Sequence, residues 1–174
     1  MYKHSITILL CAFILIVGCQ TNEKNDSKYA RATESTAAEK ELVKKEIAAR
    51  IDEIIKGAKA LNVEAAIRPY ADEPDFKIVS PDASVTDYAT MKNVQLESFN
   101  SVASMDFTTI KQEFTFLEKD LVMCTWTGKN EFELKSGERM KIEPYVGSML
   151  FRRKNNEWKI IYAHETAAPA VTIK

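Results

Sequence analysis

The clearest pattern in the chain is a change of hydrophobic period, from three or four residues in its first half to two residues in its second half. Between residues 37 and 61 apolar side chains recur at helical spacing, and charged residues such as Lys44 lie on the opposite side. Thr36 and Glu39 have the spacing of a capping box, which favours a helix start at Ala37. The pattern predicts a long amphipathic helix, Ala37 to Leu61, with one face to bury.

Shorter elements are expected between this helix and the second half of the chain. Asn62 is a suitable cap for a helix, and Pro69 ends that helix because a proline disfavours helical geometry in the residue before it. The expected elements are a helix over 63–67, a strand over 76–79, and a helix from Thr86 or Asp87 to about Ser104.

The second half alternates apolar and polar residues and contains three turn signals. The alternation predicts strands at about 106–117, 121–134, 139–152 and 157–165, and the turns lie at Glu118–Asp120, Ser136–Gly137 and Asn155–Asn156. Because short connections join consecutive strands, we expect an antiparallel meander.

Two-residue hairpins at the last two turns would determine which residues lie opposite one another. The expected pairs are Leu134 with Arg139, Gly128 with Tyr145, Trp126 with Gly147, Cys124 with Met149, Arg153 with Trp158, Phe151 with Ile160, Met149 with Tyr162, and Gly147 with His164. The expected inner face collects Val122, Cys124, Trp126, Gly128, Tyr145, Gly147, Met149, Phe151, Trp158, Ile160, Tyr162 and His164. The expected outer face collects Met123, Thr125, Thr127, Val146, Ser148, Leu150, Ile161, Ala163 and Glu165. A bulge would exchange the two faces beyond it.

One row of the expected inner face consists of Trp126, Gly147 and His164. A glycine between an indole and an imidazole leaves a dent in the sheet. Dents lined by aromatic rings with a few polar tips are typical of small-molecule pockets. The candidate ligand-binding residues are Trp126, Tyr145, Tyr162, His164, Tyr70 and Tyr88. The alternative is a tightly packed core in which His164 hydrogen-bonds to the backbone.

The N-terminus carries a targeting signal. Residues 6–17 form an apolar run that is shorter than the roughly 20 residues a spanning helix needs and is typical of a secretory signal. The run ends in Ile16-Val17-Gly18-Cys19, which resembles the lipobox of bacterial lipoprotein signal peptides. We expect a signal peptide over 1–18, lipidation at Cys19, a flexible tether over 19–35 and one domain over 36–174. A plain signal peptide that contains a cysteine is the alternative.

A lipid on Cys19 would anchor the protein to the cell envelope without spanning the membrane. Gln20 follows the cysteine, where an aspartate would favour retention at the inner membrane. We therefore expect an outer-membrane protein that faces the periplasm.

Composition excludes several classes of function. The 24 basic and 25 acidic residues do not give the basic excess of a nucleic-acid-binding protein. His4 and Cys11 fall in the signal peptide, so His164 and Cys124 remain without a metal-ligand cluster, and Cys124 has no disulfide partner. There is no glycine-rich phosphate loop. We expect no metal and no cofactor.

The order of elements, together with the final strand Trp158–Thr166 (WKIIYAHET), resembles the nuclear-transport-factor-2-like superfamily, most closely its SnoaL-like and ketosteroid-isomerase-like branch. The final strand also resembles that of the calcium/calmodulin-dependent kinase association domain. The resemblance spans about Glu39 to the C-terminus. It implies an α+β fold, in which a long N-terminal helix and two shorter helices wrap a cone-shaped, curved antiparallel sheet around a cavity.

The resemblance leaves three functions open. The first is binding of a small, partly apolar molecule in the cavity without established catalysis. The second is an isomerase, dehydratase or cyclase acting on a carbonyl compound, with a tyrosine as donor and Asp72, Asp75 or Glu143 as the acid; no catalytic pair is assigned. The third is a dimeric assembly module that pairs through the outer face of the sheet.

Overall fold

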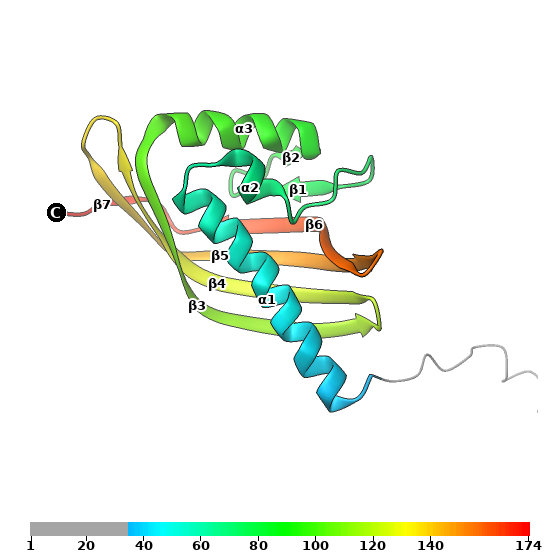
Figure 1. Ribbon diagram of the computed structural model, residues 1–174. Coiled ribbons are helices and arrows are strands. Elements are labelled where there is room, and N and C mark those ends of the chain that lie inside the picture. The colour runs from blue at the N-terminus through cyan, green and yellow to red at the C-terminus, as the bar shows by residue number, and fades with distance from the viewer. Residues whose placement is uncertain (1–34) are drawn as a thin grey trace, which may run out of the picture. The chain divides into compact units, whose positions relative to one another are not determined.

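The computed structural model describes residues 35–174 (Figure 1). The expected signal peptide, Cys19 and nearly all of the expected tether lie outside the described residues, so these remain predictions from the sequence. Within the described part of the chain, no helix is both long enough and apolar enough to cross a bilayer.

Helix α1 spans Ala37–Lys59 and begins where the capping box predicts. The Thr36 amide donates to Glu39 Oε2 at 2.7 Å, and the Glu39 amide donates to Thr36 Oγ1 at 3.2 Å. These two bonds satisfy backbone groups that the first turn leaves without partners. The helix lies diagonally across one face of the sheet, and its buried residues include Ile47 and Ile51 (Figure 1).

The shorter elements follow the expected order. They are α2 (Val63–Ile67), β1 (Lys77–Val79), β2 (Val85–Thr86) and α3 (Tyr88–Ser101). Asn62 and Asp87 cap the two helices through their side-chain oxygens. Helices α1 and α2 pack closely at Gly57, where an added Cβ would lie 2.3 Å from the Ala66 nitrogen. Helix α3 ends three residues before the expected Ser104 because Val102 already begins the next strand.

The main sheet is the expected meander with additional short strands. Its long strands are β3 (Val102–Glu118), β4 (Leu121–Leu134), β5 (Arg139–Lys154) and β6 (Glu157–Ala167). Asn155 and Asn156 both have positive φ, as the tight turn between β5 and β6 requires. The full order is β2-β1-β6-β5-β4-β3, and β7 (Val171–Thr172) pairs with β5. Strand β1 runs parallel to β6, so the sheet is mixed rather than purely antiparallel.

Two deviations cancel in the register between β4 and β5. The turn is longer than expected, so that Glu133 rather than Leu134 lies opposite Arg139. A bulge then places two β5 residues, Glu143 and Pro144, opposite one β4 residue. As a result, the expected pairs Trp126 with Gly147, Gly128 with Tyr145 and Cys124 with Met149 are confirmed.

A bulge between β5 and β6 overturns part of the expected inner face. Phe151 lies opposite Ile160, as predicted, but Leu150 lies opposite Tyr162, which leaves Ile161 as an extra residue on β6. The predicted pairs of Met149 with Tyr162 and Gly147 with His164 are therefore wrong. Met149 lies opposite Ala163, and Gly147 lies opposite Glu165.

Beyond the bulge the two faces of β6 are exchanged. Tyr162 is 37% exposed and His164 is exposed, whereas Ala163 is only 1% exposed. The sequence assigned Ala163 and Glu165 to the outer face, and both lie on the inner face instead. The physical reason is that side chains alternate along a strand, so one inserted residue turns every later side chain to the other side.

A polar cluster joins α1 to the turn between β5 and β6. Arg153 donates to Glu46 Oε2 at 2.6 Å, and the Trp158 indole donates to the same oxygen at 2.9 Å. The guanidinium of Arg153 also lies over the Trp158 ring, 4.7 Å from its centroid. These contacts tie the helix to one end of the sheet.

Candidate functional site

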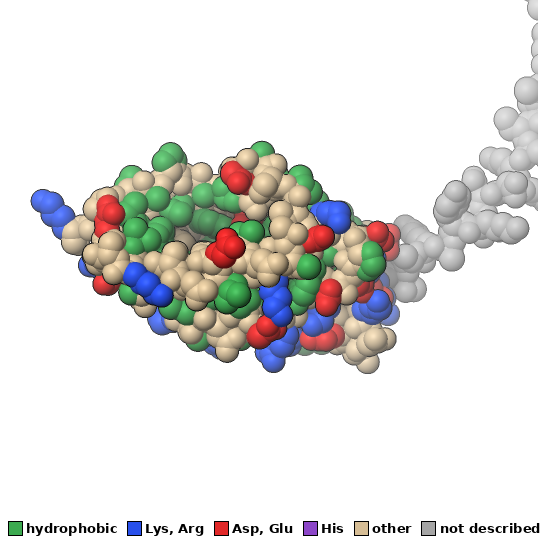
Figure 2. Space-filling model, turned by 90° about the horizontal axis from the view of Figure 1, so that it is seen from above, with side chains coloured by type: hydrophobic (Ala, Val, Ile, Leu, Met, Phe, Trp, Pro, Cys, Tyr) green, Lys and Arg blue, Asp and Glu red, His purple; other side chains and the backbone are tan. Residues whose placement is uncertain are grey.

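A cavity of about 590 Å³ lies between the helices and the inner face of the sheet. The space-filling view shows a hollow lined mostly by hydrophobic side chains (Figure 2). The apolar lining comes from every layer of the fold and includes Ile51, Ile55, Ile67, Met91, Met105, Phe107, Phe132 and Met149. A cavity of this size and character fits a small, largely apolar organic molecule.

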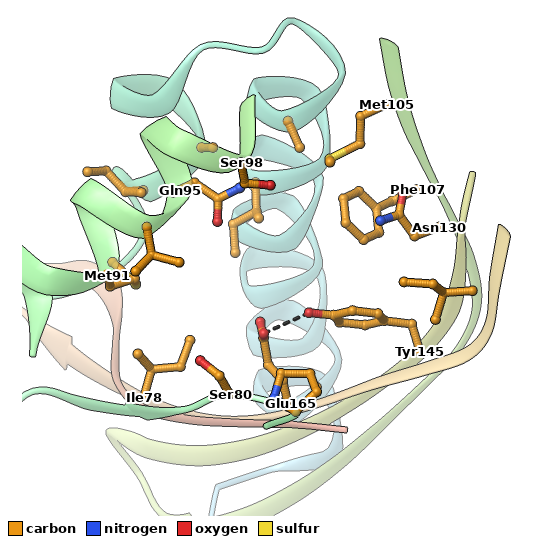
Figure 3. Close-up of a pocket in the computed structure, with 18 of the residues that line it drawn as sticks. Ile78, Ser80, Met91, Gln95, Ser98, Met105, Phe107, Asn130, Tyr145 and Glu165 are labelled. Carbon is orange, nitrogen blue, oxygen red and sulfur yellow. Dashed lines mark hydrogen bonds between the residues drawn. The ribbon is translucent and has the colours of Figure 1, made fainter. Parts of the chain in front are cut away.

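The most prominent polar feature of the cavity is a pair formed by Glu165 on β6 and Tyr145 on β5. The Tyr145 hydroxyl donates to Glu165 Oε2 at 2.7 Å (Figure 3). Tyr145 lies opposite Ala167, two residues beyond Glu165, so the pairing of the two strands brings the side chains together. Both residues line the cavity.

Tyr70 is the third polar residue of this group. The segment around it runs alongside β6, because the Ile160 amide donates to the Pro69 carbonyl and the Ala71 amide donates to the Ile160 carbonyl. Tyr70 also lines the cavity, and its ring makes an edge contact with Phe76 at 5.8 Å between centroids. The negative charge of Glu165 acts on both phenols.

Burial sets the protonation of these groups. It raises the pKa of the Glu165 carboxyl above its ordinary value of 4.5, and the hydrogen bond from Tyr145 opposes this shift without cancelling it. Burial, together with the charge of Glu165, raises the pKa of Tyr70 and of Tyr145, so both phenols keep their protons. The cavity thus holds a carboxyl whose pKa is raised and two hydroxyl donors.

An aromatic wall stands beside the pair. The rings of Phe107, Trp126 and Tyr145 pack edge to face, with centroids 5.8 to 6.3 Å apart. The Trp126 indole donates to Thr109 Oγ1 at 2.8 Å. Its ring covers Gly128, where an added Cβ would lie 2.3 Å from two ring carbons. The missing side chain at Gly128 therefore determines where the indole lies.

Gly147 leaves the cavity open in front of the wall. Gly147 lines the cavity, and an added Cβ there would meet only Met149 Cε, at 3.8 Å. The dent predicted between Trp126 and the next strand is therefore present, but Glu165 occupies the position expected for His164.

Further polar groups lie away from Glu165. Asn130 on β4 is 5% exposed, and its Oδ1 has no hydrogen-bond partner among the described residues. Gln95 and Ser98 on α3 lie across the cavity from Glu165 (Figure 3). These amides and hydroxyls offer neutral hydrogen-bonding positions.

The structure gathers half of the ligand-binding candidates predicted from the sequence. Trp126, Tyr145 and Tyr70 line the cavity. Tyr88 packs against Phe76 outside the cavity, and Tyr162 and His164 lie on the outer face of β6. None of the three acids considered for catalysis, Asp72, Asp75 and Glu143, lines the cavity.

Glu165 is the residue that sequence reasoning missed. The strict alternation of β6 placed it outside, and no residue near Ile161 signals the bulge. Among residues 35–174, no three histidine, cysteine, aspartate or glutamate side chains gather in a way that could hold a metal ion. Cys124 is buried, and burial raises the pKa of its thiol to about 12, so it is a core residue rather than a nucleophile.

The fold is that of the nuclear-transport-factor-2-like superfamily. A protein from Novosphingobium aromaticivorans, provisionally named a scytalone dehydratase, superposes with a TM-score of 0.71 at 6% identity, covering 80% of this chain and 93% of its own. A hexachlorocyclohexane dehydrochlorinase from Novosphingobium barchaimii gives 0.68 at 9% identity, over 79% and 94% of the two chains. A protein from Streptomyces avermitilis, provisionally named a dehydratase of this family, gives 0.65 at 13% identity, over 75% and 99%.

No protein-family model matches the sequence, and no curated protein matches it. At such low identities the structural similarity establishes the fold alone. The resemblance inferred from the order of elements is confirmed, while the chemistry has to be argued from the residues of the cavity.

The pKa of Glu165 predicts how stability depends on pH. A carboxyl with a raised pKa binds its proton more tightly in the folded chain than in the unfolded one. Its contribution to stability is fully present below the ordinary value of 4.5 and is lost as pH rises through the raised pKa. Glu165→Gln, which is neutral at every pH, should therefore be more stable than the natural chain at neutral pH, and the difference should vanish below about pH 4.

Urea unfolding of both chains from pH 3 to pH 8 measures this effect. Glu97→Gln, on the exposed surface of α3, is the control for the loss of a surface carboxyl. An equal difference between Glu165→Gln and the natural chain at both ends of the range would contradict the burial of Glu165.

Proposed function

We propose that the domain binds a small, largely apolar molecule inside the cavity and holds a polar group of that molecule at Glu165 and Tyr145. The supporting observation is the combination of an unfilled volume of about 590 Å³ with a polar pair on its wall. Apolar walls supply most of the affinity of such sites, and a few polar groups orient the ligand. A glycine at position 147 keeps this volume open, where a larger residue would fill it.

A second candidate function is acid–base catalysis by the same pair, of the isomerase or lyase type. The observation that favours it is a carboxyl of raised pKa in contact with a protonated phenol inside an apolar cavity. Such a carboxyl, oriented by Tyr145, can take a proton from carbon next to a carbonyl. The protonated phenol of Tyr70 in the same cavity can donate to the oxygen on which negative charge develops, since the one proton of Tyr145 is donated to Glu165. The similar structures named as a dehydratase and a dehydrochlorinase support this candidate at the level of fold.

The domain is further proposed to work at the cell envelope, tethered through a lipid on Cys19. Support for this comes from the sequence of residues 6–19. An anchor of this kind would hold the cavity near the membrane without inserting the domain into it.

Filling the cavity should weaken ligand binding strongly while the fold is kept. In Gly147→Leu the new side chain enters open space, since the nearest atom to an added Cβ is 3.8 Å away. We expect neutral apolar probes such as prodan and naphthol to bind the natural domain and to bind Gly147→Leu at least about tenfold more weakly. Fluorescence titration measures the binding, and circular dichroism checks the fold.

The matched substitution on the outer face is Ser148→Leu, at the neighbouring position of the same strand. It adds a comparable apolar side chain without entering the cavity, so it should leave probe binding unchanged. Equal binding by both variants and the natural chain would show that probes bind elsewhere and would remove the proposed site.

Proton exchange tests the second candidate. A bicyclic ketone such as β-tetralone, incubated with the domain in D2O, should gain deuterium next to its carbonyl faster than in buffer. Glu165→Gln should lower this rate by about 10²- to 10⁴-fold, as expected for loss of a general base. His164→Gln, which alters an exposed residue next to Glu165, should retain the full rate. Equal rates in all three chains would rule out Glu165 as the base.

Metabolic labelling tests the anchor. In a bacterial host, labelled palmitate should be incorporated into the full-length chain, and Cys19→Ala should abolish both the label and sedimentation with membranes. Cys11→Ala, in the expected signal peptide, should leave both unchanged. Labelled Cys19→Ala protein would contradict the predicted lipidation site.

A further inference from the structure

The charges of the cavity are all of one sign. Among residues 35–174, those that line it include two acids, Glu165 and Asp82, and no lysine, arginine or histidine. Within residues 35–174, the causes that shift the pKa of Glu165 are burial and Tyr145, and neither is a lysine or an arginine. A cleft with one sign of charge and apolar walls concentrates ligands of the opposite sign and repels ligands of the same sign.

The carboxyl of Glu165 lacks a counter-charge. Tyr145 donates to Oε2, which leaves Oε1 for a ligand, and no ion pair involves Glu165 among the residues that the structure describes. A buried carboxylate without a cation is unfavourable, and an opposite charge within about 4–6 Å restores its charged form. A ligand can supply that charge.

The wall beside Glu165 suits a cation as well. Tyr145 itself belongs to the aromatic group with Phe107 and Trp126, so a positive group placed at the carboxyl lies next to aromatic rings. The face of an aromatic ring attracts a cation within about 6 Å, most strongly when water is excluded. Aromatic rings near the carboxyl are thus compatible with the cationic group that the carboxyl favours.

We propose that the cavity is selective for organic amines: the ammonium group of the ligand pairs with Glu165 Oε1 and its apolar body fills the space in front of Gly147. This inference rests on the proposed binding function and is independent of the acid–base candidate. It also implies that carboxylates and phosphates of the same shape are rejected, because the described part of the lining has no cation that could receive them.

Three probes that differ only in their polar group test the selectivity. Naphthylmethylamine, naphthylmethanol and naphthoate, each substituted at the same ring position, carry a positive, a neutral and a negative group on one apolar body. Isothermal titration at neutral pH should show the amine binding at least about tenfold more tightly than the alcohol, and the carboxylate binding most weakly.

Variants locate the source of the preference. Glu165→Gln should bind the amine and the alcohol equally, whereas Glu97→Gln removes the same charge from the exposed side of α3 and should keep the full preference. The proposed selectivity for amines is wrong if the alcohol binds to the natural chain as tightly as the amine does, or if the preference for the amine survives in Glu165→Gln. In both cases the cavity still binds ligands, so the binding function stands. If none of the three probes binds, the inference and the binding function both lack support; if probes bind equally to Gly147→Leu, the binding function fails.

Discussion

The site depends on one extra residue in the final long strand. Ile161 has no partner on β5, so the side chains beyond it are turned over relative to the first part of β6. That single bulge places the Glu165 carboxyl in the cavity against Tyr145 and leaves His164 on the outer surface. Without it, the wall beside Gly147 would carry an imidazole, and the cavity would have a basic group where it now has an acidic one.

The bulge also fits how the sheet ends. Residues 162–164, directly after it, pair with the parallel strand β1, and Ala163 is buried there beside Ile78. Ala163 takes the inner position beside β1, and the larger Tyr162 lies on the outer face. Bulges increase local twist and re-aim side chains at the ends of sheets. The same irregularity therefore places Ala163 beside β1 and directs Glu165 inward.

Local signals were sufficient to predict most of the fold but only part of the site. The capping residues Thr36, Asn62 and Asp87 and the Asn155–Asn156 turn act within a few residues, and each lies where the sequence placed it. The parallel pairing of β1 with β6 joins residues about eighty positions apart and has no local signal. The Ile161 bulge has none either, because an apolar residue there suits both faces, and for this reason the sequence misplaces His164. Trp126 and Gly147 are predicted correctly because the two deviations between β4 and β5 cancel.

The fold and the site carry different information about function. The fold is shared with proteins named as a dehydrochlorinase and, provisionally, as dehydratases, whose sequences are only 6–13% identical to this one, so the architecture does not select a reaction. The function has to be argued from the cavity itself, which holds a partly buried carboxyl in contact with a phenol and no cation among the lining residues described. Such a carboxyl must bind a proton, pair with a positive charge on a ligand, or act as an acid or base on a ligand, since burial disfavours its isolated charge. Any function assigned to the cavity therefore has to account for Glu165.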